Sequence, residues 1–227
     1  MGPALEPYRK KLFLSCKTAQ RKQERSASEL DRSLQRLRTD HFDLYQFHHV
    51  TRMEEVEAIF SDDGAMKTFE KAKKDGKVRF LGFSAHSVEA ALAMLERYQF
   101  DSIMFPVNYA TWNAGNFGPQ VLAKAREKKM GILALKAMAK SPWPPGADRS
   151  AHPNCWYLPM TDPDEALMGL RFTLSHPVTA ALTPASETCL KLALNIAPKF
   201  TPLKPEEAEA MKRKGLAATP LFRYRQA

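Results

Sequence analysis

The stretch "FDLYQFHH" (residues 42–49) shows how the chain is organised. It is a short hydrophobic run that ends in two histidines, and successive side chains of a strand point to opposite faces. His48 therefore shares a face with Leu44 and Gln46, whereas His49 lies on the other face. We expect a strand that carries His48 at its carboxyl end, with His49 facing the neighbouring helices.

The same pattern, an apolar run with a polar residue near its carboxyl end, recurs along the chain. Carboxyl ends of parallel strands meet at one mouth of a barrel, where barrel enzymes keep their active sites. Polar side chains that occupy matching positions on several strands therefore indicate a shared site. The other strands expected, with their terminal polar residues, are 11–18 with Lys17, 78–85 with Ser84, 101–109 with Asn108 and 131–138 with Lys136.

Amphipathic segments alternate with these strands. In "SASELDRSLQRLRT" (26–39), Ser26 and Glu29 have the spacing of a capping box, and leucines recur at helical intervals. Six βα units in succession predict a parallel sheet covered by helices, in a single domain over residues 1–227. No G-x-G-x-x-G follows a strand, which disfavours a dinucleotide-binding Rossmann fold. The remaining expected elements are helices 65–75, 87–98, 118–129, 163–175, 187–197 and 205–215, strand 179–186 and a Pro-rich loop over 140–159.

Composition excludes several classes of protein. No apolar run approaches the roughly 20 residues that span a bilayer, so we expect no membrane partner. The net charge is +9, but basic residues are scattered among acidic ones, so we expect no nucleic-acid partner. Cys16, Cys155 and Cys189 form neither a CxxC pair nor a metal-ligand pattern, so we expect reduced thiols, no metal site and a cytoplasmic protein.

These segments resemble the aldo-keto reductase superfamily. "DLYQFH" is similar to the strand that ends in the family's catalytic His, and "FLSCKT" to the strand that ends in its catalytic Lys. "GKVRFLGFSAHS" is the most specific match, and "TPASETCLKLALN" resembles the late segment that grips the adenosine phosphate of the cofactor. The resemblance implies a (β/α)₈ TIM barrel. It also implies NAD(P)H-dependent hydride transfer to a small-molecule carbonyl substrate, an aldehyde or ketone.

The resemblance also assigns roles to individual residues. Lys17 and His48 match two members of the catalytic tetrad. NADP is the expected cofactor, with NAD possible, because Lys191 stands where NADP-preferring members often have Arg, whereas Ala185 stands where they often have Lys. The residues implied in cofactor binding are Ser84, Asn108, Ser186, Lys191 and Asn195.

The other two members of the tetrad, Asp and Tyr, precede the Lys in the family, and residues 1–16 contain no match to their segment. A (β/α)₈ barrel needs eight units, and six are expected here. Both counts indicate an N-terminally truncated chain, an incomplete barrel without its first two βα units. We expect impaired activity in this chain, and possible self-association through the open barrel edge.

Two other functions fit the same residues. A Schiff-base lyase or aldolase would use Lys17 or Lys136 as a carbonyl nucleophile. A non-catalytic barrel subunit would keep the fold alone. The substrate is not specified, although Trp112, Trp143, Trp156 and Tyr157 lie in loops expected to border its pocket.

Overall fold

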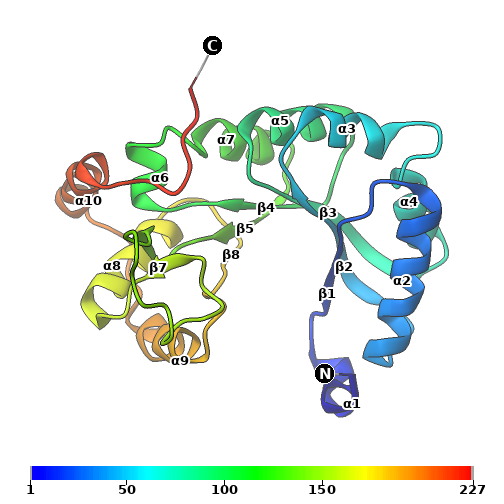
Figure 1. Ribbon diagram of the computed structural model, residues 1–227, viewed down its shortest axis with the longest axis horizontal. Coiled ribbons are helices and arrows are strands. Elements are labelled where there is room, and N and C mark those ends of the chain that lie inside the picture. Colours follow the sequence, from blue (N-terminus) through cyan, green and yellow to red (C-terminus); the bar gives the residue numbers. More distant parts are fainter. Residues whose placement is uncertain (1, 226–227) are drawn as a thin grey trace. The chain divides into compact units, whose positions relative to one another are not determined.

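The computed structural model describes residues 2–225. They form two compact units (Figure 1). Unit 1 comprises Met1–Met104 and Glu127–Met130, and unit 2 comprises Phe105–Arg126 and Gly131–Ala227. The single domain expected from the sequence stays a prediction.

Unit 1 is built on parallel strands in the order β1-β2-β3-β4. Lys17 on β1 pairs with Gln46 on β2, and Gln46 pairs with Gly82 on β3. Helices α2 and α4 lie side by side along one side of these strands (Figure 1). The elements are α1 (Gly2–Leu5), η1 (Glu6–Lys11), β1 (Ser15–Thr18), α2 (Gln23–Leu37), β2 (Phe42–Val50), α3 (Met53–Phe60), α4 (Met66–Lys74), β3 (Val78–Ala85), α5 (Val88–Arg97) and β4 (Ser102–Pro106).

Aromatic side chains dominate the core of unit 1. Phe47 of β2 stacks on Phe69 of α4 with ring centroids 3.8 Å apart, and both side chains are fully buried. Tyr45 and Phe83 are also inaccessible to solvent. Full burial of such a side chain contributes about 1.5–3 kcal/mol, so this cluster fixes the helices against the sheet.

Helix α2 begins earlier than its sequence pattern predicts. The expected capping box of Ser26 and Glu29 is wrong, because the helix starts at Gln23, with Lys22 as its N-cap. Ser26 is buried, and its hydroxyl donates to the carbonyl of Gln23. The Glu29 carboxylate accepts a hydrogen bond from Thr18 at the end of β1. The carboxylate of Glu29 therefore contacts the end of a strand and does not cap the helix.

Unit 2 contains parallel strands β5 and β8, which pair through Leu133 with Ala180 and Ala134 with Ala181. The Pro-rich segment expected to be a loop carries an antiparallel pair, β6 with β7. The elements are α6 (Tyr109–Asn113), α7 (Pro119–Glu127), β5 (Gly131–Leu135), β6 (Ala139–Pro142), β7 (Tyr157–Pro159), α8 (Pro163–Leu174), β8 (Ala180–Ala181), α9 (Glu187–Ile196), η2 (Ala197–Lys199) and α10 (Pro205–Ala217).

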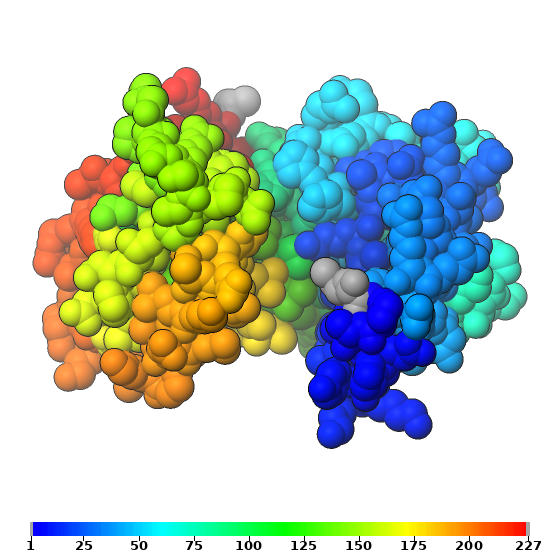
Figure 2. Space-filling view, turned by 60° about the horizontal axis from the view of Figure 1, so that its bottom comes forward, coloured from blue at the N-terminus to red at the C-terminus, as the bar shows by residue number. Residues whose placement is uncertain are grey.

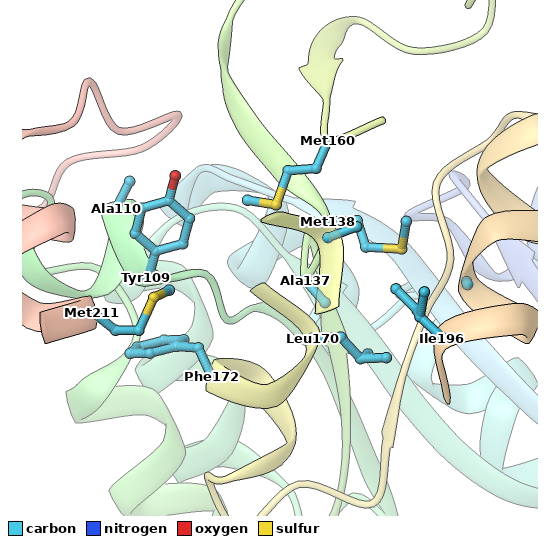
Figure 3. Close-up of a cluster of buried hydrophobic side chains, with 11 residues drawn as sticks. Tyr109, Ala110, Ala137, Met138, Met160, Leu170, Phe172, Ile196 and Met211 are labelled. Carbon is cyan, nitrogen blue, oxygen red and sulfur yellow. The ribbon is translucent and has the colours of Figure 1, made fainter. Parts of the chain in front are cut away.

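The core of unit 2 joins helices from distant parts of the sequence (Figure 3). Tyr109 of α6, Phe172 of α8 and Met211 of α10 lie near one another, and each is at most 6% exposed. Met138 and Met160 lie in the same cluster, on the segments that flank the β6–β7 pair. Methionine fills irregular gaps well, which suits a core where strands give way to a loop.

The expected α/β class with parallel strands is confirmed. The strands are shorter than expected at several ends. Residues 11–14 precede β1, and residues 107–108 lead from β4 into α6, which begins at Tyr109. Helix α3 was not expected from the sequence. It follows β2 directly, and it supplies a residue of the candidate site.

Candidate active site

Lys17, His48 and Ser84 come from three neighbouring strands of unit 1, each near the strand's carboxyl end. Strand pairing places Lys17 opposite Gln46, two residues before His48. The sequence prediction that these groups converge therefore matches their positions on the strands. Their catalytic and binding roles stay predictions.

Lys17 is half-buried, and this burial lowers the pKa of its ammonium below the ordinary value of 10.5. The lowered pKa means that burial disfavours the charged ammonium form of Lys17. Although the His48 side chain is exposed overall, its pKa is also lowered, first by partial burial of the ring and then by the charges of Lys17, His49 and Arg21. Lys17 and His48 are thus close enough for their charges to interact.

A bulge interrupts β2 at its last residues. Pairing with β3 is regular up to Phe47 and resumes at Val50, with a shift between them. His49 has φ of +56°, in the left-handed region that non-glycine residues rarely adopt. The expectation that His49 packs toward the helices is wrong, because the bulge breaks the alternation and both His48 and His49 are exposed.

The hydroxyl of Ser84 holds this bulge. Its Oγ accepts a hydrogen bond from the backbone N–H of His49 at 2.8 Å and donates to the carbonyl of Phe47 at 3.5 Å. Ser84 is 2% exposed, so these bonds are shielded from water. Within unit 1, Ser84 therefore positions the backbone that carries His48.

Arg21 and Glu55 form a second support that the sequence did not reveal. Arg21 Nη2 donates to the carbonyls of His48 at 2.7 Å and His49 at 3.4 Å, and it is 2.9 Å from Glu55 Oε1. Burial alone would raise the pKa of Glu55. Hydrogen bonds from Thr51 and from Arg21 outweigh it and lower that pKa to about 2. Glu55 lies in α3, 34 residues beyond Arg21, so no local pattern links the two.

Gly82 leaves room for polar side chains on the same face of the sheet. A Cβ at this position would lie 2.4 Å from Ser102 Oγ and 3.3 Å from Gln46 Nε2. Gln46 is fully buried, and its Oε1 accepts from Ser15 Oγ at 3.4 Å. The interior below Lys17 and His48 is therefore polar as well as close-packed.

Asn108 in unit 2 has a structural role. Its Oδ1 accepts from the N–H groups of Ala110 and Thr111, which caps α6. Its Nδ2 donates to the carbonyls of Lys136 at 3.1 Å and Ala139 at 2.7 Å. A side-chain amide has two N–H donors and an oxygen that accepts two hydrogen bonds. In Asn108, groups of the protein itself make all of these hydrogen bonds. The cofactor contact implied for Asn108 stays a prediction.

Lys136 contacts aromatic rings. Its Nζ lies 4.5 Å from the ring centroid of Tyr157 and 4.9 Å from that of Trp156. Cation–π contacts of this kind stabilise the charged ammonium. Lys136 has φ of +72°, so its backbone departs from the strand where β5 ends.

The late segment, residues 183–195, leads into α9 and forms most of it, and the loop 140–159 lies beside its N-terminus (Figure 2). Ser186 is the N-cap residue, and its Oγ contacts Thr188 Oγ1 at 2.8 Å and His152 Nδ1 at 3.2 Å. Lys191 is exposed and pairs with Glu187 at 2.6 Å. Asn195 follows Lys191 by one helical turn and is also exposed.

The cysteines are free thiols. Cys155 and Cys189 are buried in unit 2, and Cys189 Sγ lies 3.9 Å from His152 Nδ1. Burial raises the pKa of Cys155. Among residues 2–225, no group of three or more His, Cys, Asp or Glu side chains has the arrangement of a metal site.

The fold is similar to that of solved aldo-keto reductase structures. Aldo-keto reductase AKR11C1 from Bacillus halodurans (holo form) is 20% identical, with a TM-score of 0.70 over 98% of this chain and 80% of that one. An aldo/keto reductase from Klebsiella pneumoniae in complex with NADP and acetate is 21% identical, with a TM-score of 0.63 over 100% of this chain and 77% of that one. Likeness at these identities shows the fold, the α/β class of the (β/α)₈ barrels.

The family follows from the sequence match. The profile of the aldo/keto reductase family matches residues 1–154, and the chain belongs to this family of oxidoreductases. The uncharacterized oxidoreductase YrpG of Bacillus subtilis (strain 168) is 29% identical over 113 residues, which is 48% of this chain. The chain spans 33% of the length of this curated relative. In the part of the chain that the structure describes, no helix has the length and apolar character needed to cross a membrane.

Proposed function

We propose that the chain is part of an NAD(P)H-dependent reductase of small aldehydes or ketones. One observation carries this proposal: Lys17 and His48 lie on adjacent strands of a family barrel, near the carboxyl ends, with interacting charges. A Lys ammonium and an imidazole polarise a carbonyl oxygen and stabilise the negative charge that develops on it. Arg21 and Ser84 keep the backbone of His48 in place for this task.

The late segment suits the phosphate groups of a nicotinamide cofactor. Lys191 offers an exposed cation, and Ser186 is an N-cap whose hydroxyl makes no capping bond. A helix N-terminus and a nearby cation both attract phosphate. Ser186, Lys191 and Asn195 would hold NADP, with NAD possible, and the bound nicotinamide supplies a hydride. The Klebsiella neighbour, which is in complex with NADP, supports this choice.

Full activity, in our proposal, needs the family's Asp and Tyr, for which residues 1–16 show no matching segment. General acid catalysis of the kind that Tyr supplies contributes typically about 10²–10⁴-fold. We therefore propose that residues 1–227 alone turn over slowly, and that a preceding segment of about two βα units supplies the acid. A cytoplasmic setting belongs to the same proposal, because the odd cysteine count favours reduced thiols.

The edge of β1 supports self-association as a further part of this proposal. Among the described residues, β1 has one neighbouring strand, β2. Phe13, just before β1, is 62% exposed, and Leu12 is 38% exposed. An uncovered edge beside apolar side chains invites pairing with another chain. Analytical ultracentrifugation over a range of protein concentrations tests this, and a monomer at every concentration would contradict it.

A Schiff-base lyase is the second candidate, favoured by the lowered pKa of Lys17. A poorly solvated lysine has more of the neutral amine that attacks a carbonyl. Lys136 is the other lysine of this hypothesis, and its ammonium contacts the rings of Trp156 and Tyr157. Borohydride reduction in the presence of an aldehyde, followed by peptide mass spectrometry, decides between the two functions. A covalent adduct at Lys17 supports the lyase, and a pyridine-nucleotide-dependent loss of aldehyde supports the reductase.

A further inference from the structure

Two histidines that the family resemblance does not assign stand together at the end of the central strands of unit 1. The rings of His49 and His86 have centroids 4.7 Å apart and an interplanar angle of 36°. His49 follows His48 at the end of β2, and His86 follows Ala85, the last residue of β3. The ring of His48 lies 6.0 Å from that of His49. Three imidazoles are thus gathered at one end of the sheet.

The backbone is specifically arranged to bring His49 to this position. A regular strand would place it on the face opposite His48, but the bulge interrupts this alternation, and the two rings lie 6.0 Å apart. The left-handed φ of His49 is a strained conformation, and such strain persists where surrounding bonds over-determine it. Here Ser84 binds the N–H of His49 and Arg21 binds its carbonyl. The N–H of His86 donates to the carbonyl of Val50 at 3.1 Å, which fixes the second ring relative to the first.

The charged groups around this pair are mostly cationic. The positive charges of Lys17 and Arg21 both contribute to the lowered pKa of His48. Arg21 is neutralised by Glu55, the acidic group that the structure shows in contact with this turn. Cationic side chains beside exposed imidazole N–H donors favour an anionic ligand. His49 is exposed and His86 is half-buried, so a ligand reaches the first ring directly.

We propose that His49 and His86 together bind an anionic group of the carbonyl substrate, a carboxylate, and so select negatively charged aldehydes and ketones. The inference rests on the proposed reductase function and adds the substrate class to it. Lys17 and His48 act on the carbonyl, whereas the His49–His86 pair holds the carboxylate. Donation from an imidazole N–H to a carboxylate is a charge-assisted hydrogen bond, because the acceptor is ionised, and it is stronger than a neutral one.

Binding is tested without turnover. Benzoate is titrated into the 227-residue chain while the imidazole C–H signals are followed by NMR, with benzamide as the neutral isostere. We expect the signals of His49 and His86 to move saturably with benzoate and to stay in place with benzamide. His49→Gln and His86→Gln assign the signals, and each should weaken benzoate binding about tenfold.

His41→Gln is the matched control, because His41 is a histidine of the same unit that precedes β2, at its other end, and pairs with Asp40. This variant should bind benzoate as the wild type does. Equal movement with benzamide, no movement with benzoate, or an equal loss in His41→Gln would each overturn the proposal.

Selectivity is tested in a chain that turns over, extended upstream as proposed above. The ratio of kcat/KM for 4-carboxybenzaldehyde to that for its methyl ester should exceed one in the wild type, because an imidazole N–H donates more strongly to a carboxylate than to an ester. His49→Gln should remove the preference mainly through KM for the acid. If neither aldehyde reacts but benzoate binds as expected, the reductase function fails and the anion site stands. If both react with equal efficiency in the wild type, the anion site fails.

Discussion

The backbone N–H of His49 donates to the hydroxyl of Ser84 at 2.8 Å, so a side chain of β3 fixes the irregular end of β2. We expect Ser84→Ala to lower the free energy of unfolding by about 1–2 kcal/mol, because a buried N–H loses its partner. Urea titration measures this. Ser102→Ala is the control, since the buried hydroxyl of Ser102 bonds to none of the described residues. Equal destabilisation by both variants would show that Ser84 does not hold the bulge.

Lys17→Met should raise stability at neutral pH while removing function. The folded protein lowers the pKa of Lys17, so the native state binds fewer protons than the unfolded state as pH rises toward 10.5. The penalty for a charged Lys17 is therefore fully present below the folded-state pKa and fades above it. The stability gain of the variant should shrink as the pH approaches 10.5. Urea titrations of both proteins at several pH values test this, and a gain that grows with pH would contradict it.

Glu55→Gln should destabilise the protein at neutral pH, because Arg21 and the backbone around Thr51 then lose a charged acceptor. The pKa of Glu55 is lowered from 4.5 to about 2, so its stabilising effect is present above pH 4.5 and lost toward pH 2. The loss at pH 7 should be at most about 3 kcal/mol, less after screening by solvent. Thermal unfolding across this pH range measures it. Glu54→Gln, an exposed neighbour in the first turn of α3, is the control and should have little effect.

Lys191→Ala should weaken NADPH binding. Lys191 is exposed and pairs with Glu187, an arrangement in which a phosphate can take the place of the carboxylate. We expect a loss of about tenfold in affinity for NADPH and a smaller loss for NADH, measured by fluorescence titration. Lys199→Ala, a change of a basic residue just beyond α9, should leave both affinities unchanged. Equal NADPH affinity in the wild type and in Lys191→Ala would remove this residue from the site.

The 227-residue chain should show little or no carbonyl reductase activity, and a version extended upstream by about two βα units should recover it. The matched acid would then be present, and Lys17 and His48 would be held more firmly, which matters because about 1 Å of misplacement can cost 10²-fold. NADPH oxidation with a panel of aldehydes and quinones compares the two lengths. Comparable turnover from both would mean that another residue of this sequence supplies the proton.

Much of the architecture could be predicted from the sequence. The alternation of apolar strands and amphipathic helices gave the α/β class, and strand 78–85 was placed to the residue. Such patterns are readable because burial of a strand face or a helix stripe depends on residues close together in the chain. The positions of Lys17, His48 and Ser84 at strand ends follow from the same local rule.

The details that define the site depend on contacts between distant residues. Parity placed His49 opposite His48, but bonds from Ser84 and Arg21 stabilise a left-handed residue that parity excludes. Glu55 binds Arg21, which lies 34 residues earlier in the sequence. The side-chain amide of Asn108 donates hydrogen bonds to the carbonyls of Lys136 and Ala139. The sequence alone determined which residues lie near the strand ends. The tertiary structure decided how they point, because a hydrogen bond between remote segments outweighs the local preference of the backbone for a regular strand.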